Sequence, residues 1–454
     1  MLFNDYRFLF LYLPLTLIGS LLVFRGRWRE IFLIAASFAF YGFTGKLHAV
    51  VLAACILWLH LFSNARARPT RAQTVLAILG PAVVLLYFKY AAFLIGSAAA
   101  VLGLPAPALP AVSDASLPAG ISFFTFHLIA YAIDRYRGTV DRPQPLARFT
   151  LFISMFPHLV AGPILRWRDV DGGLAALPRW RLTSPAATEA VTYILFGLAL
   201  KVVLADNLDS IITPVTAQMA GMAVSDALFV IFGYSFQIYF DFYGYSLIAI
   251  GLGLLFGLRF PDNFARPYAA LNPRDFWRRW HITLSYWIRD YLYLPLGGNR
   301  SYIRNILIVF ALCGLWHGAG WNYVIWGLYH GVLVIAYHLL RTPWDRLPRL
   351  VQLGLTFVLV SAGWTLFQFD FGPWATFWSQ AFAGPLAGDR IAPAGWLLLA
   401  AATAVTVVLR PEAIAAGACA TAGGAVRWGL GMAGLVLAVL LFLDGSGAFI
   451  YFRF

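Results

Sequence analysis

The stretch that decides the fold class lies at residues 227–246, which read ALFVIFGYSFQIYFDFYGYS. Its first 14 residues carry no charged side chain, and similar apolar runs occur at 8–24, at 190–205, where Lys201 interrupts the run, and at 351–367. An α-helix needs about 20 mostly apolar residues to cross a bilayer, so each run predicts a transmembrane or re-entrant helix. The apolar runs of the whole chain add up to roughly ten to thirteen such helices.

Composition leads to the same fold class. Of the 454 residues, 61% are hydrophobic and 12% are charged, and the mean hydropathy is +0.75. A soluble domain carries about 25% charged residues, so this chain cannot cover a water-facing surface. We therefore predict an all-α, polytopic integral membrane protein in contact with membrane lipid.

The net charge is +13, from 33 Lys and Arg against 20 Asp and Glu. The basic residues form short clusters between the apolar runs, which is typical of cytoplasmic loops under the positive-inside rule. A protein that binds nucleic acid would gather them in one patch. No nucleic-acid partner is predicted.

The sequence predicts one membrane domain with three zones, which differ in how many polar residues interrupt their apolar runs. Residues 1–110 and 345–454 are plain apolar spans, whereas residues 115–340 hold six of the eight histidines. We therefore expect the chemistry in the central zone and scaffold on either side. No internal repeat is evident, which disfavours a transporter built from inverted repeats.

The first polar segment of the central zone is residues 314–321, GLWHGAGW. His317 lies between two apolar runs, and an ionisable residue at membrane depth usually serves a function or lines a watery cavity. Histidine is also the side chain best suited to proton transfer near neutral pH. The three glycines would let a ligand approach the backbone. The alternative is a histidine that only hydrogen-bonds a neighbouring helix, the reading we favour for His338, His60 and His48.

The second segment is residues 275–300, which begins DFWRRWH and ends LPLGGNR. Read as one helix, it places Trp277, His281, Leu284 and Ile288 on one face by their i, i+4, i+7, i+11 spacing. Its charge is too high for a lipid-facing span. The alternative to a cavity-lining segment is an interfacial amphipathic helix with snorkelling arginines.

Asp241 follows the apolar run with which we began. A buried aspartate needs a partner such as an Arg or a His, and the sequence does not say which. The alternative is an aspartate at a helix end that faces water. Two further histidines, His127 and His158, stand beside Pro and Gly, and we interpret them as interfacial anchors at helix breaks.

Several known catalytic and cofactor signatures are absent from the sequence. It holds no Gly-x-Ser-x-Gly elbow, no Walker loop and no His-Glu-x-x-His motif. Cys55, Cys313 and Cys419 are far apart, with neither metal nor disulfide spacing. No metal and no bound cofactor are predicted. The residues themselves indicate a membrane cavity with histidine acid/base chemistry, or else a transporter with a His and Asp relay.

The quoted segments together resemble the membrane-bound O-acyltransferase family, and within it the bacterial branch that O-acetylates polysaccharides such as alginate. The resemblance covers about half the chain, in the family's order, at 87–90, 117–138, 149–163, 241–246, 251–264, 276–300 and 314–319. It implies a ring of spans around a central funnel. It also implies transfer of an acetyl or other short acyl group to a hydroxyl.

The resemblance places the family's invariant histidine on His317 and a second functional histidine on His281. His317 is then the general base, and His281 orients the donor or relays protons. Arg278 or Asn299 is a candidate for stabilising the oxyanion, and Asp241 for fixing a neighbouring Arg or His. The residues predicted to bind substrate are Asp241, Trp277, Arg278, Trp280, Asn299 and Trp316.

The resemblance also implies partners and a location. The expected donor is cytoplasmic acetyl-CoA, whose phosphates suit a basic cytoplasmic face. The expected location is the bacterial plasma (inner) membrane. There the acyl group passes to periplasmic acetyltransferase partner proteins and finally to a polysaccharide, with alginate the first candidate. Peptidoglycan or another exopolysaccharide is the alternative acceptor.

Overall fold

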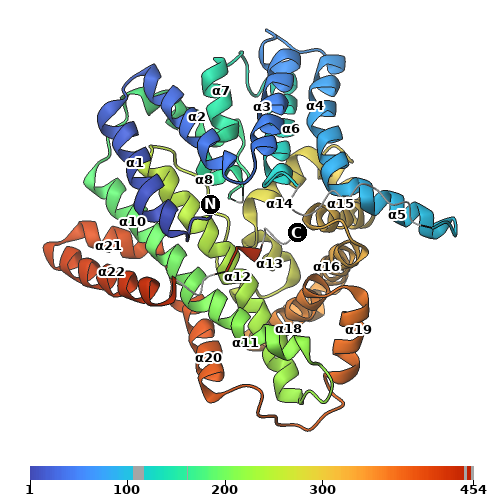
Figure 1. The fold of residues 1–454 in the computed structure, drawn as a ribbon. Coiled ribbons are helices and arrows are strands. Elements are labelled where there is room, and N and C mark those ends of the chain that lie inside the picture. The colour runs from blue at the N-terminus through green and yellow to red at the C-terminus, as the bar shows by residue number, and fades with distance from the viewer. Residues whose placement is uncertain (106–116, 161, 444–446, 451–454) are drawn as a thin grey trace. The chain divides into compact units, whose positions relative to one another are not determined.

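The computed structural model describes residues 1–105, 117–160, 162–443 and 447–450, and every regular element in these ranges is a helix (Figure 1). In the described ranges, six helices are long and apolar enough to cross a membrane: Lys46–Asn64, Arg71–Val101, Ser184–Ala217, Val224–Leu255, Arg349–Gln368 and Ala422–Phe442. A seventh span is possible across the helix pair Pro393–Val408 and Pro411–Ala420, which bends by 62°. The predicted all-α, multi-pass membrane protein is therefore confirmed, while the central funnel stays a prediction.

The chain divides into two compact units, residues 1–191 with 248–261, and residues 192–247 with 262–454. The expected zone boundary near residue 110 lies outside the described residues. The boundary near residue 340 stays a prediction.

The first unit contains nine α-helices: α1 (Leu13–Ile18), α2 (Arg27–Gly42), α3 (Lys46–Leu59), α4 (Arg71–Leu85), α5 (Ala91–Val101), α6 (Ile121–Arg137), α7 (Leu146–Ser154), α8 (Phe156–Leu159) and α9 (Trp167–Ala176). Helix α4 begins with a capping box, in which the Thr70 side chain accepts from the Gln73 backbone and the Gln73 side chain accepts in return. His127 and His158 pack together at 4.9 Å between ring centroids, and His127 Nε2 accepts a hydrogen bond from the Leu165 backbone. Both histidines are buried, so they are packing residues of this unit.

The second unit carries the segments that the sequence singled out. Two helices have part of their length in each unit, α10 (Ser184–Ala199) and α12 (Val224–Leu255). The other helices are α11 (Asp206–Ala217), α13 (Pro273–Arg279), α14 (Ile282–Ile288), α15 (Tyr302–His317), α16 (Trp321–Leu339), α17 (Arg341–Asp345), α18 (Arg349–Gln368), α19 (Phe371–Gln380), α20 (Pro393–Val408), α21 (Pro411–Ala420) and α22 (Ala422–Phe442).

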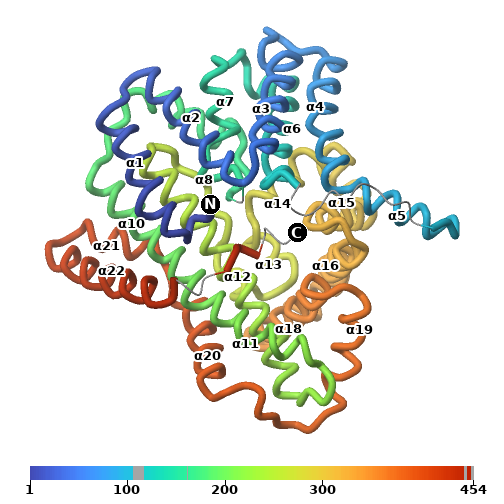
Figure 2. The backbone as a smooth tube through the Cα atoms, viewed as in Figure 1, coloured from blue at the N-terminus to red at the C-terminus, as the bar shows by residue number. Residues whose placement is uncertain are grey.

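Helices α15 and α16 pack side by side, as the backbone tube shows (Figure 2). Glycine makes this packing possible because a Cβ on Gly314 would lie 2.0 Å from the Tyr323 carbonyl oxygen, and one on Gly327 would lie 2.1 Å from that of Phe310. We expected the glycines near His317 to admit a ligand. At Gly314 the chain itself fills that space, so this expectation is wrong there.

Candidate active site

His317 is the last residue of α15, and its side chain is buried. Three aromatic rings surround the imidazole: Trp316 at 4.9 Å, Trp326 at 5.2 Å and Phe367 at 5.4 Å between ring centroids. Gly318 follows in an extended conformation and ends the helix. The histidine is thus held at a helix end inside an aromatic shell that keeps water away from it.

His281 lies at a break between α13 and α14, so the single helix predicted over this segment is wrong. Its φ is +46°, in the left-handed region that non-glycine residues rarely adopt. Such a conformation costs about 1–3 kcal/mol and persists only where its surroundings impose it. The break therefore has a local cause.

Asn263 provides that cause. The Ile282 backbone N–H donates to the Asn263 carbonyl at 2.9 Å, and Thr283 Oγ1 donates to Asn263 Oδ1 at 2.9 Å. His281 Nδ1 lies 3.0 Å from the same Oδ1 and must be the donor in this contact, because an amide oxygen can only accept. The neutral ring then carries its lone pair on Nε2. Burial lowers the pKa of His281 to about 3, which keeps the ring neutral.

The two candidate catalytic histidines come together although they are 36 positions apart in the sequence. Their ring centroids are 6.3 Å apart, and Trp316 lies 6.0 Å from His281. This spacing lets both imidazoles contact one reacting group. The Phe242 ring of α12 also packs against His281, edge-on at 4.7 Å between ring centroids.

A cavity of about 270 Å³ opens between residues of α13 through α16, and neither His281 nor His317 is among the residues that line it. Trp277, Arg278 and Asn299 lie on its wall, as does Cys313. Cys313 precedes His317 by one helical turn, so the two side chains share a face of α15. On α15 the cavity therefore reaches to within one helical turn of His317.

The cavity wall is positively charged. It includes Arg274, Arg278 and Arg289. Arg289 pairs with Asp290 at 2.7 Å, whereas Arg274 and Arg278 have no carboxylate within 4.0 Å among the described residues. On the same wall Asn299 Oδ1 accepts a hydrogen bond from the Tyr293 hydroxyl at 2.7 Å. Two uncompensated guanidinium groups on a wall made largely of aliphatic and aromatic side chains favour an anionic ligand.

Two other predicted site residues lie elsewhere in the second unit. Trp280 is buried against Trp364 at 4.8 Å and Phe264 at 5.0 Å, within the aromatic core. Asp241 lies in the middle of α12, so it is not at a helix end, and its partner is Lys201 rather than an Arg or a His. The sequence showed Lys201 only as an interruption of an apolar run. The substrate-binding role expected of both residues stays a prediction.

Sequence reasoning missed Asn263 and His330. His330 is fully buried, with its ring 5.2 Å from Trp277 and 5.1 Å from Trp326. Because Trp326 also contacts His317, its indole ring lies between the imidazoles of His317 and His330. The i, i+4 spacing of Trp326 and His330 on a predicted helix was a signal that could have found this contact.

The family model described as "MBOAT, membrane-bound O-acyltransferase family" matches residues 139–369. An Azotobacter vinelandii protein named "Probable alginate O-acetylase AlgI" is 37% identical over 401 residues, which cover 82% of this chain and 79% of the relative. A protein of the same name from Pseudomonas aeruginosa is 37% identical over 399 residues, covering 82% and 76%. A Helicobacter pylori protein named "Peptidoglycan O-acetyltransferase" is 32% identical over 410 residues, covering 81% and 77%.

Proposed function

Because the chain belongs to the membrane-bound O-acyltransferase family and is therefore an O-acyltransferase, we propose that it moves an acetyl group across the bacterial inner membrane for O-acetylation of a polysaccharide. The observation that carries this proposal is the pair of buried imidazoles, His317 and His281, whose centroids are 6.3 Å apart, with His317 one helical turn from Cys313 on the wall of the cationic cavity. Alginate is the first candidate polysaccharide, since relatives at 37% identity are named for it.

The proposed reaction uses His317 as general base. Its imidazole takes the proton of an acceptor hydroxyl as that oxygen attacks the thioester carbonyl. The C–S bond then breaks, and the proton returns to the departing thiolate, so atoms and charge balance. Arg278 or Asn299 stabilises the developing oxyanion. The neutral His281, held by Asn263, orients the donor or relays the proton.

The cavity supports a phosphorylated thioester, acetyl-CoA, as the donor. Arg274 and Arg278 suit the phosphates, and Trp277 suits the apolar part of the arm. Its volume of about 270 Å³ is slightly below the roughly 300–1,000 Å³ typical of small-molecule sites, so it would hold part of a long donor. The aromatic shell around His317 would keep water from hydrolysing the thioester.

The acceptor side of the proposal rests on the relatives alone. The acetyl group would pass to periplasmic acetyltransferase partner proteins and from them to the polysaccharide. Peptidoglycan is the second candidate, because a relative at 32% identity is named as its O-acetyltransferase. Deleting the gene and analysing ester-bound acetate in each polymer fraction separates the two candidates.

The test of the proposal is the substitution of His317 by Gln or Ala in a strain that lacks the wild-type gene. We expect polysaccharide acetylation to disappear, while immunoblotting shows normal amounts of the protein in the membrane. His338→Gln is the matched control, because His338 lies near the end of α16 against Tyr302 and should tolerate the change.

Two results would count against the proposal. Full acetylation in both His317 variants would show that His317 is not the general base. If vesicles take up a solute in a way that depends on this protein but needs no acyl donor, the result would favour the alternative function, a transporter with a His and Asp relay.

A further inference from the structure

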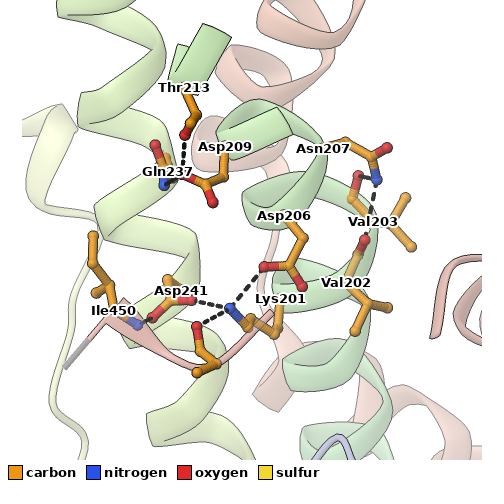
Figure 3. Close-up of polar contacts among 11 residues, drawn as sticks. Lys201, Val202, Val203, Asp206, Asn207, Asp209, Thr213, Gln237, Asp241 and Ile450 are labelled. Carbon is orange, nitrogen blue, oxygen red and sulfur yellow. Dashed lines mark hydrogen bonds and ion pairs between the residues drawn. The ribbon is translucent and has the colours of Figure 1, made fainter. Parts of the chain in front are cut away.

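Lys201 occupies an unusual position for a cation. It lies on a π-helical turn, Leu200–Ala205, within the long apolar helix Ser184–Ala217, and its side chain is 2% exposed. Its Nζ donates to Asp206 Oδ1 at 2.7 Å and to Asp241 Oδ1 at 2.5 Å (Figure 3). A single turn of π-helix inside an α-helix often marks a functional position.

The chain's own C-terminal segment completes this cluster. One ammonium between two carboxylates leaves a net negative charge and unfilled hydrogen-bonding positions, which are costly when buried. The Ala448 carbonyl accepts from Lys201 Nζ at 3.1 Å, and the Ile450 backbone N–H donates to Asp241 Oδ2 at 2.8 Å. Figure 3 shows Ile450 directed at Asp241, on the carboxylate side away from Asp206.

Apolar contacts add to these hydrogen bonds. Phe449 is 1% exposed, and its ring meets Tyr245 edge-on at 4.5 Å. Lys201 Nζ lies 4.9 Å from the centre of the Phe449 ring, within the range of a cation–π contact. Residues 447–450, which we call the C-terminal segment, are therefore seated on α12 by charge, by hydrogen bonds and by packing.

The residue that binds the C-terminal segment is adjacent in the sequence to a residue that contacts the candidate active site. Asp241 binds the C-terminal segment, and the next residue, Phe242, supports the ring of His281 at 4.7 Å. Gly244 brings α12 close to α10, because a Cβ there would lie 2.6 Å from the Gly197 carbonyl oxygen. A shift of α12 at Asp241 would therefore move Phe242 and with it the support of His281.

We propose that the C-terminal segment is a positioning element of the acyl-transfer site, seated by Lys201 and Asp241 so that α12 holds His281 in place. The proposal rests on the function proposed above. In this proposal Lys201 and residues 447–450 act only through α12 and the ring of His281. Their loss therefore lowers the rate of acetyl transfer and leaves binding of the donor in the cationic cavity unchanged.

The test variant is Asp241→Asn. It leaves Lys201 paired with Asp206, so the cluster keeps one positive and one negative charge and the protein is expected to fold. It removes the charge that holds the Ile450 N–H. The maximal rate of acetyl transfer from labelled acetyl-CoA should fall by about 10- to 100-fold, the range that a small misplacement of a catalytic group produces. The KM for acetyl-CoA should stay the same.

The matched control is Gln237→Leu. Gln237 lies one turn earlier on α12, is also buried, and donates to Asp209 on α11 at 2.8 Å without contacting the C-terminal segment (Figure 3). If the rate depended only on polar contacts between α11 and α12, Gln237→Leu would lower it as much as Asp241→Asn. We expect it to stay near the wild-type rate.

A second readout follows the segment itself. Ile450→Cys keeps the backbone N–H and is placed in a chain whose Cys55, Cys313 and Cys419 are replaced by Ala. We expect a maleimide to label the introduced thiol slowly in this background and several-fold faster when Asp241→Asn is added.

The outcomes separate the two proposals. Faster labelling with an undiminished rate of transfer would overturn the positioning role, and so would labelling that Asp241→Asn leaves unchanged. Neither result bears on the general base, because retained activity in the His317 variants is what defeats the proposed function.

Discussion

At the scale of the single residue, the site depends on Asn263 as much as on the histidines. One side-chain oxygen receives the His281 ring, the Thr283 hydroxyl and, at 3.3 Å, the Thr283 backbone N–H. Its amide nitrogen donates to Ser246 Oγ at 3.3 Å. A residue that binds no substrate in the proposed reaction thus fixes both the ring tautomer and the helix break.

Asn263→Ala should lower both activity and stability. It leaves the Thr283 backbone N–H, the Thr283 hydroxyl and the His281 ring without their shared acceptor. Each unsatisfied buried group costs about 1–3 kcal/mol. Thermal unfolding in detergent and acetyl transfer in membranes measure the two effects. Ser246→Ala is the control, because it removes only the contact to the amide nitrogen and should change both quantities little. Equal losses in the two variants would show that the shared oxygen has no special role.

At the scale of the element, the α15 and α16 pair carries His317 and depends on two glycines. Gly314 and Gly327 place the backbones in direct contact, so no side chain separates the helices. The same pair forms much of the wall of the cationic cavity, from Tyr302 and Val309 on α15 to Val334 on α16. The position of His317 is therefore a property of a helix pair.

Gly314→Ala should separate these helices. The new methyl group would lie 2.0 Å from a carbonyl oxygen that cannot move without moving α16, and overpacking of this kind costs about 1–3 kcal/mol. We expect a lower melting temperature in detergent and loss of acetyl transfer. Gly354→Ala in α18 is the control, since a Cβ there meets nothing within 4 Å. It should be neutral or stabilising, because alanine is the better helix former.

The cationic wall makes a separate prediction about the donor. Arg274→Gln with Arg278→Gln should raise the KM for acetyl-CoA by about tenfold or more, since a hydrogen bond to a charged group contributes about 1.5–3 kcal/mol. The KM for acetyl-pantetheine, which lacks phosphates, should change little. Arg341→Gln, an exposed arginine paired with Asp345 on α17, is the control. If the double variant keeps the wild-type KM for acetyl-CoA, the donor does not bind at these two arginines.

At the scale of the whole molecule, hydropathy identifies the spans but does not rank them. Helix α12 and helix α22 both pass as membrane spans, with mean hydropathies of 1.5 and 2.0. Yet 94% of the most apolar stretch of α12 is buried inside the protein, against 11% for α22. Lipid and protein interior are both apolar, so the same composition suits a central helix and a peripheral one.

The sequence by itself determined the membrane character, the helical class and the two histidines worth testing. The first two follow from composition, and the two histidines follow from the resemblance of short motifs, whose residues are neighbours in the chain, to those of the family. Only the tertiary structure decided the partners. Asn263 and His281 are 18 positions apart, Lys201 and Asp241 are 40, and Asp241 and Ile450 are 209. Contacts at such separations depend on how helices pack, and no local pattern records that packing. The helix through His281 was predicted unbroken for this reason, and the seat of the C-terminal segment on Asp241 was not foreseen.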